Sequence, residues 1–291
     1  MRIIERSAVN VNQWNALVRQ AGGSFFSYSW YLDAVAENWC LLIDDDYSRG
    51  MALPYTKRMG VEILYVPIFS RTMEAMGELS DDAINLIKKR FKVIELATRN
   101  NIFSTNETRV HQVIIDYDNR KLSSQAKRSL KKALNSGVQT TGNESYSFVF
   151  NAIEEELQGK FKGVDAERMT RLNRLFQSAE QVGSLKVFEV SDGDQTGGIV
   201  CLEDETKLLY LKGACPEKLK KSGGMYFALN SAIEYAKERN LSFDFGGSNV
   251  DGVRRFNKNL GGVDQTYYYY ESNEAPFWFQ WARKIKNQGI R

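Results

Sequence analysis

The stretch that decides the fold lies near the end of the chain. It reads Phe243-Asp244-Phe245-Gly246-Gly247-Ser248, then Gly252-Val253-Arg254-Arg255-Phe256-Asn257-Lys258-Asn259-Leu260-Gly261-Gly262. Apolar residues alternate over Leu241–Phe245, which predicts a strand with Asp244 on the face opposite to them. The glycines that follow predict a backbone that bends closely round a neighbouring group. An acid in such a strand is either an ion-paired structural group or a functional residue.

The segment before this strand predicts a second feature of the same region. A strand over Lys207–Leu211 is followed by a loop, and the loop by Lys220-Lys221-Ser222-Gly223-Gly224 at the start of a helix over Gly224–Arg239. Two glycines before a helix let backbone N–H groups converge on an anion, and the lysines add positive charge. The ordinary alternative is a turn followed by a solvated loop, and both interpretations stay open.

The predicted elements follow the same order in each half of the chain, helix-helix-strand-strand-strand-helix-strand-strand. In the first half the helices are expected at Val11–Ala21, near Trp30–Val35 and after Ser80, and the strands at Trp39–Ile43, Met51–Thr56, Glu62–Pro67, Lys92–Ala97 and Val110–Tyr117. In the second half, besides the elements named above, helices are expected at Ser123–Asn135, Phe148–Leu157, Ala166–Val182 and Val250–Leu260, and strands at Leu185–Val190, Gly197–Leu202 and Val263–Glu271.

This repetition predicts two domains of the α/β (α+β) class. We expect an N-terminal domain over residues 1–120 and a C-terminal domain over residues 121–275 that opens with a basic helix. We expect the aromatic and basic segment 276–291 to form a helix that packs back on the first domain.

Composition excludes several classes of protein. The 291 residues are 43% hydrophobic and 26% charged, which is enough apolar material for a core and argues against disorder. The net charge of +3 excludes adhesion of the whole molecule to nucleic acid. Cys40, Cys201 and Cys215 are an odd number without a CxxC motif, so a disulfide framework is not expected. Without an apolar membrane span or a secretory signal, we expect a bacterial, cytoplasmic protein, with the aromatic-basic tail leaving a membrane-peripheral location open.

Several catalytic sets are absent from the sequence. The chain has one histidine, His111, within a predicted strand, where a structural role is the favoured interpretation. Serine-hydrolase, Walker A, dinucleotide-binding and zinc-peptidase motifs do not occur. Hydrolase triads, P-loop NTPases and zinc peptidases are therefore disfavoured.

The glycine-flanked stretch resembles the C-terminal signature of the Fem-like acyltransferases, a branch of the GNAT acyl-CoA N-acyltransferase superfamily. The weaker parts of the resemblance are Lys127-Arg128-Ser129-Leu130-Lys131-Lys132-Ala133, Phe25-Phe26-Ser27 with Trp30-Tyr31, and Leu53-Pro54-Tyr55. The resemblance implies two tandem GNAT-like domains, each a mixed, mainly antiparallel sheet flanked by helices. It also implies transfer of an acyl or aminoacyl group to an amine, without a metal.

The resemblance further implies positions for the site. The candidate catalytic residues are Asp244, Lys258 and Tyr210. The residues that would bind the donor and its phosphates are Lys220, Lys221, Ser222, Gly223, Gly224, Arg254 and Arg255. Those that would line the acceptor cleft are Tyr226, Gly246, Gly247 and Ser248. Two departures from the family's pattern are visible. The phosphate loop matches only in part, and Asn257 stands where many members carry lysine.

The expected function is N-acyl transfer from acyl-CoA or aminoacyl-tRNA to an amine of a cell-envelope or polysaccharide-type acceptor. The acceptor is a small molecule, glycan or peptide, and the basic helix within residues 120–132 is a candidate contact for tRNA. The alternative is a catalytically silent module of the same fold that binds a phosphorylated or saccharide ligand. The oligomeric state is left open.

Overall fold

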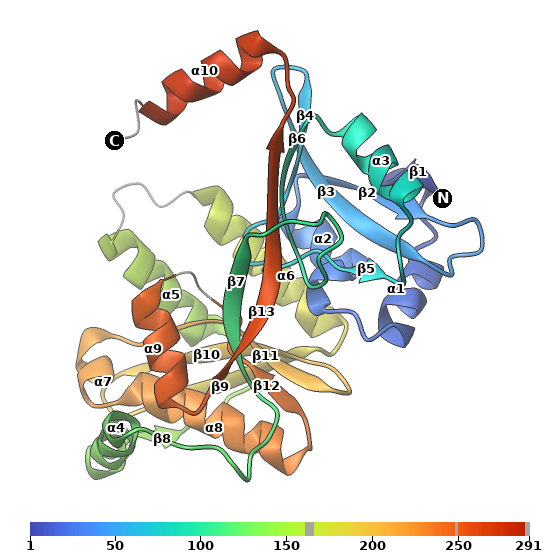
Figure 1. The fold of residues 1–291 in the computed structure, drawn as a ribbon. Helices are drawn as coiled ribbons and strands as arrows, with labels where there is room; N and C mark the ends of the chain where they lie inside the picture. Colours follow the sequence, from blue (N-terminus) through green and yellow to red (C-terminus); the bar gives the residue numbers. More distant parts are fainter. Residues whose placement is uncertain (161–165, 248–249, 289–291) are drawn as a thin grey trace. The chain divides into compact units, whose positions relative to one another are not determined.

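The computed structural model describes residues 1–160, 166–247 and 250–288 (Figure 1). Its contacts divide the chain into two compact units. Unit 1 consists of Met1–Arg109 and Thr266–Arg291, and unit 2 of Val110–Gln265. The sequence predicts the boundary between residues 120 and 121 instead, with one continuous domain on each side.

Unit 1 is built on a mixed sheet. The strands follow one another in the order β1 (Arg2–Glu5), β2 (Asn38–Ile43), β3 (Gly50–Arg58), β4 (Val61–Tyr65), β6 (Val93–Thr98) and β13 (Val263–Asn273), and the short β5 (Ala75–Met76) pairs with β3. The pair β4 and β6 is parallel, and the other pairs are antiparallel. The inner strand β2, between β1 and β3, is buried along nearly its whole length, because its residues are apolar on both faces.

The helices of unit 1 are α1 (Val11–Gln20), α2 (Ser29–Val35), α3 (Asp81–Arg90) and α10 (Phe277–Gln288), with single 3-10 turns at Arg6–Ala8 and Phe25–Ser27. The sequence predicts the start of α3 correctly. The Ser80 side chain accepts a hydrogen bond from the backbone N–H of Ala83, and two acidic residues follow in the first turn.

Unit 2 is likewise built on mixed strand pairing. Its strands lie in the order β8 (Gln139–Thr140), β9 (Leu185–Ser191), β10 (Thr196–Glu203), β11 (Lys207–Ala214), β12 (Ser242–Asp244) and β7 (Thr108–Ile114). The pair β11 and β12 is parallel, and the others are antiparallel. In each unit a helix leads from one parallel strand to the next, α3 in unit 1 and α8 (Gly224–Glu238) in unit 2.

The helices of unit 2 cover both faces of its sheet (Figure 1). On one side α8 packs on β9–β12, and α4 (Ser124–Asn135) packs on α8. On the other side lie α5 (Ser147–Lys160), which contacts β10 and β11, and α6 (Ala166–Gln181), which contacts β9. The core between α8 and the sheet is continuous and apolar, because α8 buries Ala228, Leu229, Ala232, Ile233 and Ala236 at helical spacing.

The structure confirms the predicted fold class, a mixed and mainly antiparallel sheet flanked by helices. It differs from the sequence prediction in the placement of two strands. Val110–Tyr117 is expected to close the first half and Val263–Glu271 the second. Instead β7 pairs with β12 of unit 2, and β13 pairs with β6 of unit 1. The segment before Ser222, expected to be a loop, contains the short helix α7 (Glu217–Lys221).

Candidate functional site

The strands β11 and β12 form a fork at the centre of unit 2. They pair only over Lys207–Leu209 and Ser242–Asp244, while β11 continues to Ala214. The fork opens beside a β-bulge in β11. Cys201 of β10 faces Tyr210, whereas Val200 faces Lys212, which leaves Leu211 as the extra residue. Bulges re-aim backbone groups, and they are common next to active sites. We call this region, Leu209–Ala214 with Asp244–Gly247, the β11–β12 fork.

Asp244 ends β12 at the base of this fork and is nearly buried, with 8% of its surface exposed. Its Oδ1 accepts a hydrogen bond from the backbone N–H of Gly246 at 2.9 Å. The same atom lies 3.3 Å from Nδ1 of His111, which β7 places beside it and which is also buried. The backbone N–H of Phe245 donates to the carbonyl of Gln112, so β7 and β12 are held together next to this pair.

The contact between His111 and Asp244 determines where the imidazole proton lies. An ionised carboxylate only accepts hydrogen bonds, and Asp244 already accepts one from Gly246. The proton of a neutral imidazole therefore sits on Nδ1 of His111, and the lone pair is on Nε2. A carboxylate that fixes the tautomer of a histidine is a recurring part of acid–base sites. The sequence favours a structural role for His111, and it contains no local signal for this pair.

The tautomer of His111 gives a direct prediction. In protein labelled with ¹⁵N-histidine, His111 supplies the only imidazole signals, because the chain has one histidine. We expect the wild-type protein to show the Nδ1–H tautomer. Asp244→Asn should populate the Nε2–H tautomer, since an amide both donates and accepts. Long-range ¹H–¹⁵N spectra measure the ratio, with Asp118→Asn as an exposed control. An unchanged tautomer in Asp244→Asn would contradict the pair.

Two other residues of the fork lie directly against each other. A side chain on Gly246 would place its Cβ 2.4 Å from the carbonyl oxygen of Tyr210, and Gly246 has a positive φ of 77°. Only glycine fits such a position, which explains the first glycine of the sequence signature. Burial raises the pKa of the Tyr210 phenol well above its ordinary value, so the hydroxyl remains protonated and can act as a donor.

A second cluster surrounds Asp264, a residue that the sequence does not single out. Lys258 of α9 (Asp251–Asn259) places Nζ 2.8 Å from Oδ2 of Asp264, and Arg254 forms an ion pair with the same carboxylate. Nε2 of Gln112 donates to Oδ1 at 3.0 Å. The Arg254 guanidinium, with Lys258 and Gln112, holds the pKa of Asp264 well below its usual range. Two cations on one acid leave a net positive charge here, and the neighbouring Arg255 is exposed.

We expect the Asp264 cluster to stabilise unit 2 in a pH-dependent way. A carboxylate whose pKa is lowered by folding stabilises the protein above its unfolded value of about 4, and this contribution is lost as the pH falls further. Asp264→Asn should therefore lower the free energy of unfolding by about 1 kcal/mol at neutral pH. The difference from wild type should shrink below about pH 4. Urea denaturation at several pH values measures both, with Asp118→Asn as the exposed control, and a pH-independent difference would count against the cluster.

Asn257 replaces the lysine of the family pattern, and the structure gives it a structural role. It is 1% exposed, and its Nδ2 donates to Oε1 of Gln112 at 3.0 Å. Gln112 thereby links Asn257 to Asp264 through its two amide atoms. A lysine at this position would bury a charge, which is costly without a partner.

The glycines before α8 have a packing reason. Gly223 has a φ of 92°, and a Cβ there would lie 2.4 Å from the carbonyl oxygen of Ser129 in α4. A Cβ on Gly224 would lie 2.7 Å from the side chain of Leu219 in α7. The close approach of α4 and α7 to the start of α8 therefore requires small residues here. An anion could still meet the N-terminus of α8, so phosphate binding remains a proposal.

The polar residues of this loop lie in different surroundings. Lys220 forms an ion pair with Glu156 of α5. Lys221 is exposed, and its Nζ lies 3.7 Å from Oε1 of Glu217. Ser222 follows the last residue of α7. Tyr226, expected in the acceptor cleft, packs on Phe256 of α9 with ring centroids 4.6 Å apart. Gly247 is exposed, and Ser248 lies outside the described residues.

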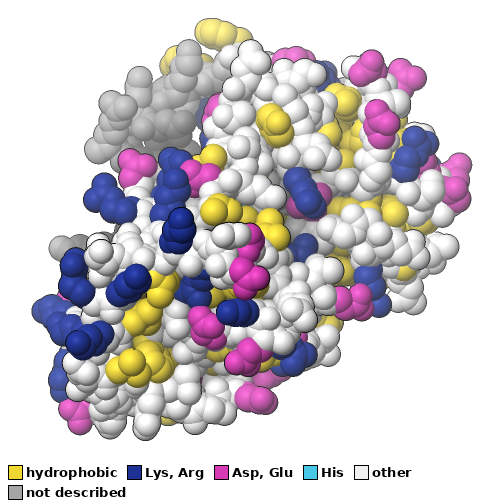
Figure 2. All heavy atoms as spheres, turned by 60° about the horizontal axis from the view of Figure 1, so that its bottom comes forward, with side chains coloured by type: hydrophobic (Ala, Val, Ile, Leu, Met, Phe, Trp, Pro, Cys, Tyr) yellow, Lys and Arg dark blue, Asp and Glu magenta, His cyan; other side chains and the backbone are white. Residues whose placement is uncertain are grey.

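Basic side chains gather on the surface of unit 2. Lys127, Arg128, Lys131 and Lys132 of α4 are exposed, whereas Ala126 and Ala133 face the core. Figure 2 shows Lys and Arg side chains concentrated toward the left of this view, with acidic side chains nearer the middle. The net charge of +3 does not reveal this local concentration of basic side chains, because acidic side chains elsewhere offset them.

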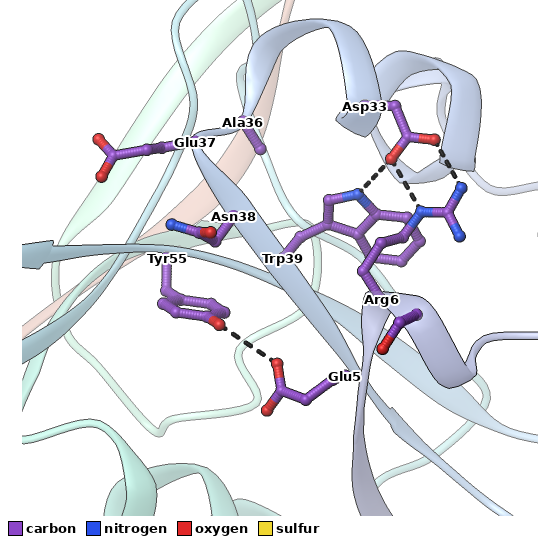
Figure 3. A pocket seen from close by; sticks show the side chains of 9 residues that line it. Glu5, Arg6, Asp33, Ala36, Glu37, Asn38, Trp39 and Tyr55 are labelled. Carbon is purple, nitrogen blue, oxygen red and sulfur yellow. Dashed lines mark hydrogen bonds and ion pairs between the residues drawn. The ribbon is translucent and has the colours of Figure 1, made fainter.

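A pocket of about 310 Å³ lies in unit 1, and none of the candidate site residues named from the sequence lines it (Figure 3). Asp33 accepts two hydrogen bonds from Arg6 and one from the indole N–H of Trp39, and Tyr55 donates to Glu5. The polar side chains Arg6, Asp33, Trp39, Glu5 and Tyr55 of this pocket therefore bond to one another (Figure 3).

Within the part of the chain that the structure describes, His, Cys, Asp and Glu form no group of three or more that could hold a metal ion. Over the same residues, every helix is too short or too polar to cross a bilayer.

No protein-family model matches the sequence, and a comparison with curated proteins finds no match. Solved structures do match. FemX superimposes with a TM-score of 0.62 at 11% identity, covering 94% of this chain and 98% of that chain.

Two further matches are similar in extent. L-PGS from Bacillus licheniformis has a TM-score of 0.55 at 13% identity and covers 92% of this chain and 94% of its own. The C-terminal domain of a putative lysylphosphatidylglycerol synthetase from Agrobacterium fabrum has a TM-score of 0.54 at 13% identity, with 90% and 91% covered. Since the matches span nearly whole chains, the likeness includes both units. The chain therefore shares the fold of FemX and of these two structures, and FemX carries the Fem name that the sequence signature resembles.

Proposed function

We propose that the protein is an N-acyltransferase that moves an acyl or aminoacyl group from a thioester or an aminoacyl ester to an amine. The observation that carries the proposal is the β11–β12 fork, where a bulge in β11 lies beside Asp244 and its partner His111. The chain shares its fold with FemX and with a domain of a putative lysylphosphatidylglycerol synthetase. This likeness supports the proposed class of reaction.

The chemistry needs three things from the protein. The amine nitrogen attacks the acyl carbonyl, and backbone N–H groups of β11 past Leu209 would stabilise the negative charge that develops on its oxygen. Nε2 of His111 would take the proton that the amine loses, with Asp244 holding the imidazole in the required tautomer. The bond to the leaving thiolate or ribose oxygen then breaks, and the leaving group takes up a proton. The phenol of Tyr210 is a donor placed on the same strand.

The donor would be acyl-CoA or aminoacyl-tRNA, both of which carry phosphates. We propose that these phosphates meet the start of α8 beside Gly223 and Gly224, where the helix dipole is positive. Lys221 and Arg255 are exposed cations of the same unit, and Ser222 offers a hydroxyl next to Gly223. Lys220 would join them by exchanging Glu156 for phosphate. Arg254 and Lys258 would remain with Asp264 and contribute their net charge.

Isothermal titration with acetyl-CoA, longer acyl-CoAs and charged tRNA tests the proposal at its first step. We expect one donor class to bind, and Lys221→Ala with Arg255→Ala to weaken that binding. Transfer of a radiolabelled acyl group to a panel of amines, covering amino sugars, peptides and amino lipids, tests the second step. Binding of none of the donors would overturn the proposed function.

The acceptor is proposed to be an amine of the cell envelope or of a polysaccharide. It would approach past Gly246 and Gly247, beside Tyr226. If the donor is tRNA, we propose that the exposed cations of α4 contact its backbone. Binding should then weaken steeply with salt, because each phosphate contact releases counterions. A flat salt dependence in filter binding would exclude α4 as the contact.

A second candidate function is a silent binding module for a phosphorylated or saccharide ligand. The observation that favours it is Asn257, which occupies the lysine position of the family and is buried against Gln112. In that case a ligand binds, but labelled acyl groups are not transferred to any acceptor in the panel. Asp244→Asn would then leave binding intact.

A further inference from the structure

The helix α10 exposes large aromatic side chains. Phe277 is 82% exposed, Trp278 48% and Trp281 60%. Transfer of each of these side chains out of water would lower the free energy, because burial of apolar surface is favourable. Scattered single apolar residues are common on protein surfaces, but three aromatic residues within two turns of one helix form a patch.

The opposite face of α10 ties the helix to unit 1. Phe279 is 4% exposed and belongs to a cluster with Ile63, Val93 and Ala275. Arg283 forms an ion pair with Glu95 of β6. Since successive helical residues are about 100° apart, Phe277 and Trp281 share a face, and Phe279 lies about 200° from Phe277. The aromatic face is therefore held outward while the helix follows directly on β13 (Figure 1).

The charge of this segment is of one sign. From Ala275 to Arg291 the sequence contains Arg283, Lys284, Lys286 and Arg291, and no acid. In a chain with 36 acidic and 39 basic residues, such a segment stands apart from the overall balance. Tryptophan and phenylalanine beside lysine and arginine are the side chains that settle in the headgroup region of anionic membranes.

We propose that α10 binds the surface of an anionic lipid bilayer, with Phe277, Trp278 and Trp281 inserted among the headgroups. The positive charge that the sequence of this segment carries adds electrostatic attraction to an anionic surface. A second copy of the chain is a poorer occupant, because two copies of this segment would bring their like charges together. The patch also consists of three aromatic residues, against the roughly 20–30 residues that each partner contributes to a stable protein interface. The inference is independent of the transfer reaction, because it needs neither donor nor acceptor.

Vesicle sedimentation with the full chain tests this proposal. The probes are vesicles of phosphatidylcholine alone and of phosphatidylcholine mixed with phosphatidylglycerol, at low and high salt. We expect binding to the mixed vesicles that weakens with salt and is at least about tenfold weaker on phosphatidylcholine alone. Phe277→Ala with Trp281→Ala should reduce binding to the mixed vesicles by about tenfold or more. The matched control is Phe148→Ala on α5, where the phenylalanine is 57% exposed.

The outcomes separate clearly. Loss of binding in the double variant, with Phe148→Ala unchanged and both variants folded by circular dichroism, supports the proposal. No binding of the wild type to mixed vesicles overturns it, as does binding that the double variant retains. Gel filtration of the wild type and the double variant tests whether a second copy of the chain binds the aromatic face instead. A dimer that dissociates in the double variant would assign the aromatic face to a second copy and overturn the lipid proposal.

Discussion

Asp244→Asn is expected to lower the rate of acyl transfer by about 10²–10⁴-fold, the usual contribution of a positioned acid–base group. The physical reason is the tautomer of His111. Asparagine occupies nearly the same space as aspartate, but it no longer fixes a proton on Nδ1, so the lone pair on Nε2 is present in only part of the molecules. The measurement is single-turnover transfer of a labelled acyl group from a donor that binds.

The partner variant makes this prediction specific. His111→Gln should lose a comparable factor, and the double variant should be hardly slower than either single variant, since the two residues act as one unit. Multiplicative losses would mean that Asp244 and His111 act separately. Donor binding by titration should stay close to wild type in each variant, because neither residue is proposed to hold phosphate. A normal rate in Asp244→Asn would remove the pair from the mechanism.

The fold could be predicted from the sequence because its signals are local. Alternation over Leu241–Phe245, the helical spacing of Met225–Ala236 and the cap at Ser80 each belong to one element. The pairing of β7 with β12 and of β13 with β6 could not be predicted in the same way. Both strands are adjacent in sequence to elements of the other unit, and no local pattern states which sheet will accept a strand.

The candidate site shows the same limit of local signals. Asp244 stood out because it is an acid within an apolar strand. His111 did not, since its contact with Asp244 joins residues 133 positions apart and depends on the register of two paired strands. Asp264 resembled an ordinary residue near the start of a strand, yet it holds Arg254 and Lys258, which the sequence assigned to other roles.

The glycines show where a functional pattern and a packing requirement overlap. Gly223-Gly224 before a helix is the pattern of a phosphate loop, and the structure shows that α4 approaches Gly223 too closely for any side chain. The N–H of Gly223 itself donates to the carbonyl oxygen of Lys220, so a phosphate would have to meet the N–H groups that follow it in the first turn of α8. Stability measurements separate the two roles.

Gly223→Ala is expected to lower the free energy of unfolding by about 3 kcal/mol. A positive φ costs an alanine roughly 1–2 kcal/mol, and the clash of its Cβ with the carbonyl oxygen of Ser129 adds a cost on the order of 1–3 kcal/mol. Backbone atoms of a helix cannot move aside as a flexible side chain can, so α4 or α8 must shift. Urea denaturation followed by circular dichroism measures the change.

Gly137→Ala is the matched control for this variant. Gly137 ends α4 with a φ of 73°, and a Cβ there would meet nothing within 4 Å. Gly137→Ala should therefore lower the free energy of unfolding only by the cost of the positive φ, about 1 kcal/mol. Lys221→Ala, an exposed change in the same loop, should leave stability within about 0.5 kcal/mol of wild type. If Gly223→Ala were no less stable than Gly137→Ala, the close approach of α4 would not be what the glycine serves, and the phosphate loop would be its better explanation.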